Sequence, residues 1–168
     1  MIHLRQATPD DFPAIIGLIE NAAAWLADKD TDQWQRPWPD RAARDARVMG
    51  GIEHRLTWVE ERDGRVAATV TLTTTVQREL WAEHEPDAPA LYLHRLVVHR
   101  DHAGHGMGAE IIDWAEARGP GLLRIDVWKT NESLHKYYLR QGFEFVGMSR
   151  LSGYPSAALF HRKMVTVG

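Results

Sequence analysis

Residues 91–98 (LYLHRLVV) form an almost continuous apolar run with β-branched side chains, a pattern typical of a buried strand. A polar break covers residues 99–105. The chain then enters an amphipathic helix, whose apolar side carries Ile111, Ile112, Trp114 and Ala115. Glycines before this helix would let several backbone N–H groups converge, and the helix start adds a partial positive charge. This order of strand, glycine turn and helix indicates an anion site, so a phosphate-bearing ligand is the first hypothesis.

The remaining pattern predicts an α/β fold with a central mixed sheet of about six or seven strands and about four helices. A first helix begins after Thr8, with a proline and two acids in its first turn, and ends near Ala27. Strands are predicted over residues 2–7, 56–60, 65–75, 91–98, 122–127, 143–150 and 157–165. Further helices are predicted over residues 41–50, from the glycine motif at 104–108 to about 119–121, and over 132–140.

Two features predict how these elements connect. Residues 62–64 are a hairpin signal between two strands, and Gly142 is placed to end the last helix. Because a helix separates the strands at 91–98 and 122–127, we expect that pair to be parallel. The last two strands should form an antiparallel pair.

The glycine motif itself, Gly104-His105-Gly106-Met107-Gly108, fits neither of two common nucleotide sites. A dinucleotide fingerprint requires G-x-G-x-x-G after the first strand, whereas this spacing is G-x-G-x-G past mid-chain. A P-loop requires Gly-Lys-Ser/Thr, which does not occur. A tight turn followed by close helix packing would also select these glycines, so the motif alone leaves that alternative open.

Composition indicates one domain over residues 1–168, with 44% hydrophobic residues and no apolar run of membrane-spanning length. The start of the chain shows no signal-peptide pattern, so we expect a cytoplasmic protein and no membrane partner. The absence of cysteine excludes disulfides and thiol nucleophiles. A net charge of -3 without a basic block disfavours nucleic acid as a partner.

Two linked motifs resemble the GNAT superfamily of acyl-CoA-dependent N-acetyltransferases. Residues 103–108 (AGHGMG) look like the family's pyrophosphate loop, Q/R-x-x-G-x-G/A, with Ala103 in place of the usual Gln or Arg. Residues 131–143 (NESLHKYYLRQGF) resemble its N-x(6)-Y-x(3)-G-F signature at the correct distance downstream. The likeness covers roughly residues 55–165. It implies the GNAT fold with a parallel βαβ cofactor unit, and acetyl-CoA as co-substrate.

The resemblance assigns the cofactor contacts residue by residue. Backbone groups of Leu96, Val97 and Val98 would pair with the pantetheine amides as an added strand does. An N–H near Val97 or Val98 would stabilise the oxyanion. Asn131 would contact the cofactor arm, although its type also suits a helix N-cap. The pyrophosphate would be held by Gly104, His105, Gly106, Met107, Gly108 and Ala109.

Tyr138 matches the family's general acid, which would donate to the departing thiolate. Its alternative is a core aromatic, with the adjacent Tyr137 as a decoy. The general base is open between Asp126, at the end of its strand, and His94, whose ordinary pKa of about 6.5 suits proton collection through water. The competing interpretations are a pairing of Asp126 with Arg124, a satisfied core histidine at position 94, and a plain water chain.

Residues 28–40 form a proline-broken loop near three tryptophans, Trp25, Trp34 and Trp38. These side chains either anchor the loop or line the acceptor site. As a lid, the loop's acids Asp28, Asp30 and Asp32 would favour a cationic amine. The scattered histidines at 94, 99, 102 and 105 lack metal-ligand spacing, so we expect no metal.

The sequence therefore predicts an N-acetyltransferase that moves acetyl from acetyl-CoA to a primary amine of a small molecule, by direct attack in a ternary complex. A non-catalytic acyl-CoA-binding sensor and a toxin-type aminoacyl-tRNA acetyltransferase are the alternatives. The family resemblance is compatible with a homodimer. The sequence does not name the amine.

Overall fold

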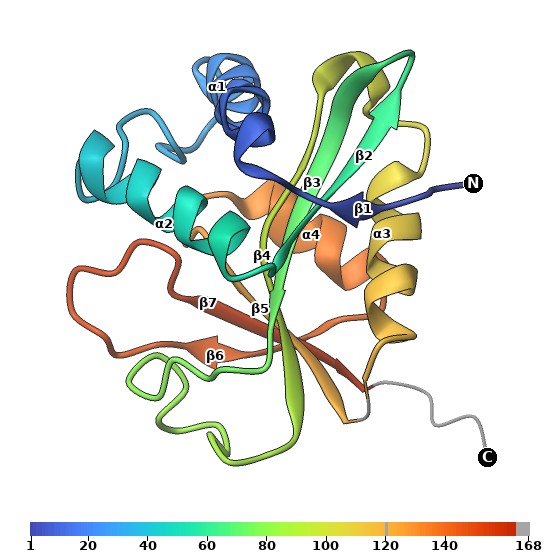
Figure 1. The fold of residues 1–168 in the computed structure, drawn as a ribbon. Helices are drawn as coiled ribbons and strands as arrows, with labels where there is room; N and C mark the ends of the chain where they lie inside the picture. Colours follow the sequence, from blue (N-terminus) through green and yellow to red (C-terminus); the bar gives the residue numbers. More distant parts are fainter. Residues whose placement is uncertain (120, 164–168) are drawn as a thin grey trace. The chain divides into compact units, whose positions relative to one another are not determined.

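The structure is a computed structural model that describes residues 1–119 and 121–163. Its strands form a seven-stranded sheet in the order β1-β2-β3-β4-β5-β7-β6 (Figure 1). The strands are β1 (Arg5–Gln6), β2 (Thr57–Arg62), β3 (Arg65–Thr73), β4 (Ala90–Val98), β5 (Leu122–Val127), β6 (Glu144–Met148) and β7 (Ala158–Lys163). The α-helices are α1 (Phe12–Leu26), α2 (Arg41–Glu53), α3 (Met107–Glu116) and α4 (Glu132–Arg140), and 3-10 turns lie at η1 (Pro9–Asp11) and η2 (Arg100–His102). The predicted mixed α/β sheet is confirmed.

The chain divides into two compact units. The first unit comprises Met1–Thr71 and Arg95–Ile111. The second comprises Leu72–His94 and the described residues from Ile112 onward. The three boundaries between the units fall inside regular elements, namely β3, β4 and α3.

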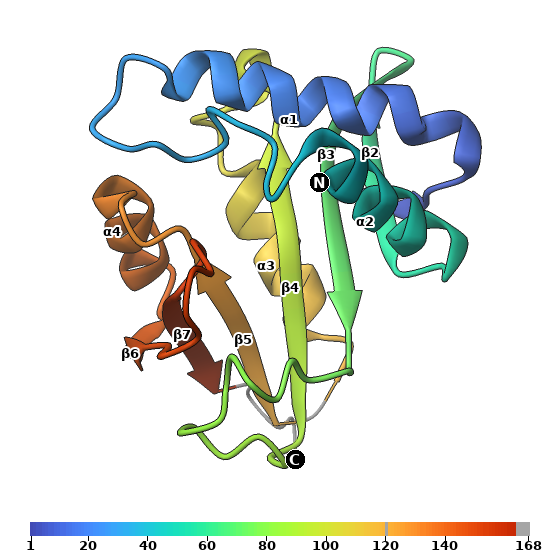
Figure 2. The same ribbon diagram turned by 90° about the vertical axis from the view of Figure 1, so that its left-hand side faces the viewer.

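In the first unit, α1 and α2 pack together (Figure 2). Apolar side chains of α1 recur at positions 15, 18 and 19, the spacing that places them on one face of a helix. This face joins a buried cluster with residues of α2, β2 and β4. The cluster is Ala7, Ile15, Leu18, Ile19, Val48, Ile52, Val59 and Val97.

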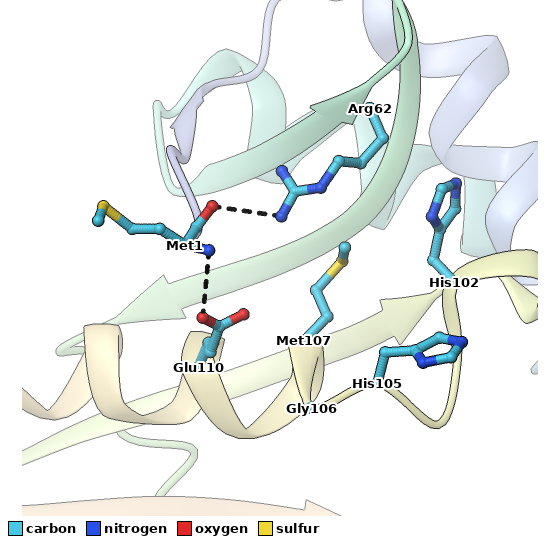
Figure 3. Close-up of a pocket in the computed structure, with 7 residues that line it drawn as sticks. All are labelled: Met1, Arg62, His102, His105, Gly106, Met107 and Glu110. Atoms are coloured by element: carbon cyan, nitrogen blue, oxygen red, sulfur yellow. Dashed lines mark hydrogen bonds and ion pairs between the residues drawn. The ribbon is translucent and has the colours of Figure 1, made fainter.

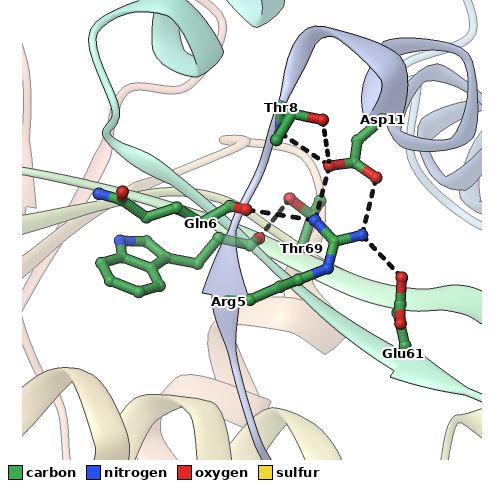
Figure 4. A network of polar contacts seen from close by, with 7 residues as sticks. Arg5, Gln6, Thr8, Asp11, Glu61 and Thr69 are labelled. Carbon is green, nitrogen blue, oxygen red and sulfur yellow. Dashed lines mark hydrogen bonds and ion pairs between the residues drawn. The ribbon is translucent and has the colours of Figure 1, made fainter.

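A polar network fixes the chain entering α1 (Figure 4). Both guanidinium Nη atoms of Arg5 donate to the Asp11 carboxylate, at 2.8 and 2.9 Å, and one also donates to Glu61 at 2.7 Å. The same carboxylate accepts the Thr8 backbone N–H at 2.7 Å. The Arg5 hydrogen bonds, with further help from Thr8, outweigh burial and hold the pKa of Asp11 below its usual value.

Replacing Asp11 with asparagine should therefore lower the free energy of unfolding by about 1–2 kcal/mol at pH 7, because a charge-assisted network is lost while Arg5 stays partly solvated. Since the folded-state pKa of Asp11 is depressed, its stabilisation is present above about pH 4 and is lost as the pH falls through the folded-state pKa. Urea unfolding at pH 7 and pH 3 should show the gap between variant and wild type narrowing in acid. Asp10→Asn, an exposed neighbour in the same turn, is the control and should change little. A gap that is equal at both pH values would contradict the assignment.

In the second unit, β4 and β5 are parallel, with Leu93 opposite Ile125, as predicted. The strands β6 and β7 form the predicted antiparallel pair, and β7 lies between β5 and β6. A buried cluster of Leu80, Trp81, Tyr92 and Leu159 joins these strands to the segment that precedes β4.

Several predicted boundaries were wrong by a few residues. The first strand is limited to Arg5–Gln6, because only these residues pair with β2. The first helix opens as the 3-10 turn η1, and α3 ends at Glu116 rather than at residues 119–121. The second helix continues to Glu53, three residues beyond its prediction. The last strand is described to Lys163; the predicted residues 164 and 165 lie outside the described chain.

Candidate functional site

The glycine loop of the first unit lies between η2 and the first turn of α3. Gly104 and Gly106 have φ of 83° and 84°, in the left-handed region that a side chain disfavours. A Cβ built on either glycine would meet no atom within 4 Å, so these glycines are not explained by tight packing. The glycines are explained by the left-handed backbone conformation, which turns the chain sharply just before α3. The first N–H groups of a helix have no partners within the helix. This geometry fits an anion cradle.

A hollow of about 570 Å³ lies beside this loop in the same unit (Figure 3). Its lining is Met1, Arg62, His102, His105, Gly106, Met107 and Glu110. The Arg62 guanidinium forms an ion pair with Glu60 and donates to the Met1 carbonyl. The terminal ammonium of Met1 lies 3.6 Å from Glu110. The charged groups of the hollow, Arg62, Glu110 and the terminal ammonium, each have an ion-pair partner. The remaining polar groups in its lining are the imidazoles of His102 and His105 and the backbone of the loop.

The remaining predicted cofactor residues of this unit lie on β4 and at the start of α3. Val97 is buried in the core cluster, whereas Leu96 and Val98 are half-buried. Just before them, Arg95 has φ of 49°, a strained conformation for a residue with a long side chain. This outlier turns the backbone immediately ahead of the residues predicted to meet the pantetheine. Gly108 and Ala109 lie in the first turn of α3.

In the second unit, the two candidate bases lie together. The parallel register pairs Tyr92 with Arg124 and Leu93 with Ile125, so His94 and Asp126 follow as neighbours on one face. His94 Nδ1 lies 3.6 Å from Asp126 Oδ1. The other carboxylate oxygen accepts a hydrogen bond from the Tyr154 hydroxyl at 3.2 Å. Sequence reasoning missed Tyr154, because a lone tyrosine in a loop carries no motif.

The alternative pairing of Asp126 with Arg124 is wrong. Arg124 is buried, 2% exposed, and donates to the Tyr92 hydroxyl at 2.9 Å and to the carbonyl oxygens of His84 and Glu85. Its guanidinium also lies over the Trp81 ring, 4.7 Å from the centroid. Arg124 therefore binds groups in the core of this unit. The Asp126 carboxylate instead contacts His94 and Tyr154.

The helix α4 places the two signature residues at its ends. Asn131 is the N-cap, as its type suggested: its side chain accepts the Leu134 N–H at 3.1 Å. At the other end, the N–H groups of Gly142 and Phe143 donate to the carbonyls of Leu139 and Tyr138, the two bonds of a Schellman motif. Gly142 has φ of 86°, so it ends the helix as predicted.

Tyr138 is buried against aromatic rings. The rings of Phe143 and Tyr137 stand edge-on to it at 5.4 and 5.3 Å. Burial raises the pKa of Tyr138 above its ordinary value, and the neighbouring Tyr137 and the negative charge of Asp126 raise it further. Tyr138 is therefore neutral throughout the physiological range, and its phenol is within electrostatic reach of the candidate base.

The three predicted substrate tryptophans differ in their surroundings. Trp34 packs against the core cluster of the first unit, which favours the loop-anchoring interpretation. Trp25, on α1, is 41% exposed and lies 3.6 Å beneath the Arg100 guanidinium. Trp38 is also exposed, with the Arg47 guanidinium 5.6 Å from its ring. Their contact with an acceptor stays a prediction.

Within residues 1–119 and 121–163, no group of three or more His, Asp and Glu side chains is arranged to hold a metal ion. Over the same part of the chain, none of the helices has the length and apolar character needed to cross a bilayer.

The mixed sheet, its parallel β4–β5 pair and the glycine loop before α3 define an acyltransferase-type α/β fold. The sequence profile of the "Acetyltransferase (GNAT) family" matches residues 20–143. The chain is 34% identical to YesJ, an uncharacterized N-acetyltransferase of Bacillus subtilis, over 88% of this chain and 84% of that protein. It is 24% identical to the S-alkylcysteine N-acetyltransferase of the same organism, over 83% of this chain and 77% of the relative.

A GNAT-family acetyltransferase of Streptococcus agalactiae has the same fold in its crystal structure, with a TM-score of 0.78 and 22% identity over 96% of this chain and 95% of that one. The chain therefore belongs to the GNAT acetyltransferase family. It is an acetyl-CoA-dependent acyltransferase.

Proposed function

We propose that this protein transfers acetyl from acetyl-CoA to a primary amine of a small molecule by direct attack in a ternary complex. The observation that carries the proposal is the polar set of the second unit. It combines a buried neutral phenol, Tyr138, with a carboxylate–imidazole pair, Asp126 and His94, whose charge acts on that phenol. A proton donor and a proton acceptor in the same unit, with the acceptor's charge felt by the donor, suit a reaction that moves protons at both ends.

The residues assigned to the cofactor fit an acyl-CoA. The left-handed glycines Gly104 and Gly106 give the loop a curled backbone at a helix start, which suits a pyrophosphate. Backbone groups at Leu96, Val97 and Val98 would meet the pantetheine amides, and an N–H of Val97 or Val98 would stabilise the oxyanion. Asn131 caps α4 through its side-chain oxygen, and its position at the start of this helix is where the resemblance expects a contact with the cofactor arm.

Acetyl transfer to an ammonium group releases two protons from nitrogen. The first must leave before attack, because only the neutral amine has a lone pair, and we assign its removal to His94 backed by Asp126. The amine nitrogen then bonds to the carbonyl carbon and the C–S bond breaks. The nitrogen loses its second proton as the amide forms. Of the two protons that leave the nitrogen, one ends on the sulfur of the released thiol and the other passes to solvent.

The raised pKa of Tyr138 defines its part in that step. A thiol has an ordinary pKa near 8.5, so a phenol with a pKa above 10 transfers its proton to a thiolate only uphill. It is, however, a permanently protonated donor in a poorly solvated position. We therefore assign to Tyr138 a hydrogen bond to the departing sulfur, which stabilises the charge that develops as the C–S bond breaks.

The acceptor is proposed as a small amine, and two observations guide its identification. The relative named for S-alkylcysteine acts on an amino-acid derivative. Near Trp25 and Trp38 the first unit carries the loop acids Asp28, Asp30 and Asp32, which would attract a cation. An amine screen should therefore contain S-alkylcysteines and other amino acids together with polyamines.

Thermal unfolding with acetyl-CoA, and with NAD as the control, tests the cofactor step. A ligand at about 100 times its Kd adds about 2.7 kcal/mol to the free energy of unfolding, so we expect a clear rise in Tm with acetyl-CoA alone. Thiol release then reports turnover for each amine without background, because the chain has no cysteine. No shift at millimolar acetyl-CoA would sink the proposal. A shift without turnover on any amine would indicate an acyl-CoA-binding sensor instead.

A further inference from the structure

We propose that Tyr154 is a positioning residue of this enzyme: by holding the Asp126 carboxylate, it keeps the His94 imidazole in the tautomer that can act as a base. The inference rests on the proposed function, because it assigns the role of base to His94. Tyr154 lies in the connection between β6 and β7, outside every motif of the sequence.

The hydroxyl of Tyr154 is held in place by its loop. The Tyr154 side chain packs against the buried cluster of Leu80, Trp81, Tyr92 and Leu159. Backbone hydrogen bonds pin the loop on both sides, from Ser149 N–H to the Ala157 carbonyl at 2.7 Å and from Lys129 N–H to the Pro155 carbonyl at 3.0 Å. The phenol therefore reaches Asp126 from a rigid support.

The carboxylate of Asp126 has its two oxygens engaged differently. Oδ2 accepts the Tyr154 hydrogen bond at 3.2 Å, which fixes the plane of the group. Oδ1 is thereby presented to His94 Nδ1 at 3.6 Å, within ion-pair range. An ionised carboxylate only accepts hydrogen bonds, so it favours the proton on Nδ1, which is the tautomer whose lone pair lies on Nε2.

The Asp126 carboxylate beside His94 also stabilises the protonated form of the imidazole. When Nε2 takes a proton from the substrate ammonium, the imidazole becomes a cation, and the Asp126 carboxylate lies beside it to stabilise that charge. The groups around this pair come from three elements: Asp126 from β5, Tyr154 from the β6–β7 loop and Tyr138 from α4. Tyr92, on the same face of β4, has its hydroxyl turned to Arg124, from which it accepts a hydrogen bond at 2.9 Å.

The test is Tyr154→Phe, which keeps the ring and its packing and removes only the hydroxyl. Nitrogen-15 NMR of histidine side chains in the enzyme without substrates should show His94 shifting from the Nδ1–H tautomer toward Nε2–H, the form that free imidazole favours. The kcat should fall roughly 10-fold with the KM for acetyl-CoA unchanged, as expected when a charged group loses its orienting hydrogen bond. The acidic limb of the pH–rate profile should move with the tautomer.

The matched control is Ser149→Ala in the same loop. It removes the acceptor of the Leu151 N–H hydrogen bond and leaves Asp126 untouched. It should leave the His94 tautomer and kcat within about twofold of wild type. An unchanged tautomer in Tyr154→Phe, or an equal change in both variants, would overturn the inference.

The NMR measurement needs no turnover, so it separates this inference from the proposed function. If no amine is acetylated but the His94 tautomer responds to Tyr154→Phe, the positioning role stands and the reaction assignment fails. If acetylation is found and the tautomer does not respond, the enzyme uses another base and Tyr154 is only a packing residue.

Discussion

Replacing Tyr138 with phenylalanine should lower kcat by about 10²-fold and leave the Kd for acetyl-CoA within about twofold. The substitution keeps the ring that packs against Phe143 and Tyr137, so α4 should remain folded. It removes the donor that we assign to the departing sulfur, and one such donor contributes about 10²–10³-fold to kcat. Stopped-flow thiol release measures kcat, and calorimetry with acetyl-CoA measures the Kd.

The adjacent residue supplies the control for this variant. Tyr137 is half-buried on the same helix, and its pKa is also raised by burial. Tyr137→Phe removes an equivalent hydroxyl one position away, so it should retain kcat within about twofold. If Tyr137→Phe loses as much activity as Tyr138→Phe, the hydroxyl of Tyr138 has no special role. An acetyl-CoA affinity lost in Tyr138→Phe would instead identify a binding residue.

The second large effect is expected for Asp126→Asn, with kcat/KM for the amine about 10²-fold lower at pH 7. The amide keeps the size of the side chain and an oxygen for Tyr154, but it removes the negative charge beside His94. Without that charge the imidazolium formed during proton removal is less stable. The defect should shrink as the pH approaches 10, because an alkylamine then loses its proton without help. Rates measured from pH 6.5 to pH 9.5 test this.

A second carboxylate–histidine pair of the same unit provides the comparison. Glu144 Oε2 lies 3.5 Å from His161 Nε2, between β6 and β7. Glu144→Gln removes an equivalent charge from a pair whose carboxylate is largely exposed, and exposed charges contribute little. It should leave kcat/KM unchanged at every pH. A defect of Asp126→Asn that stays constant up to pH 9.5 would show that Asp126 is not part of proton removal.

The sequence predicted the parts of the fold that local periodicity encodes. The strand at 91–98, the helix at 132–140 and the strand at 122–127 were located within one residue, because each has a long, consistent pattern. The first strand was predicted too long, at residues 2–7, since pairing with a neighbour decides where a strand begins and stops. The parallel β4–β5 pair followed from its crossover helix alone.

For the candidate site, the sequence predicted local backbone roles only at residues that belong to a motif. Asn131 and Gly142 were found in their expected capping roles, and Gly106 has the left-handed backbone of a cradle. The strained Arg95 could not be anticipated, because nothing in an arginine's chemistry favours that conformation. Tyr154 could not be predicted from the sequence either, because its proposed role depends on a hydrogen bond to Asp126, 28 residues earlier in the chain.

The burial of Arg124 has a consequence for the acid two residues further along β5. Both side chains lie on one face of the strand, and a guanidinium free to turn toward Asp126 would clamp that carboxylate as a permanent counter-ion. The two Nη groups of Arg124 instead donate to uncharged acceptors, a phenol and two main-chain carbonyls. The segment that supplies those carbonyls thus holds the guanidinium of Arg124 away from the Asp126 carboxylate. It keeps a strong cation away from the carboxylate that we propose for proton removal, so a shift of the backbone at residues 84 and 85 should alter catalysis from outside the reacting groups.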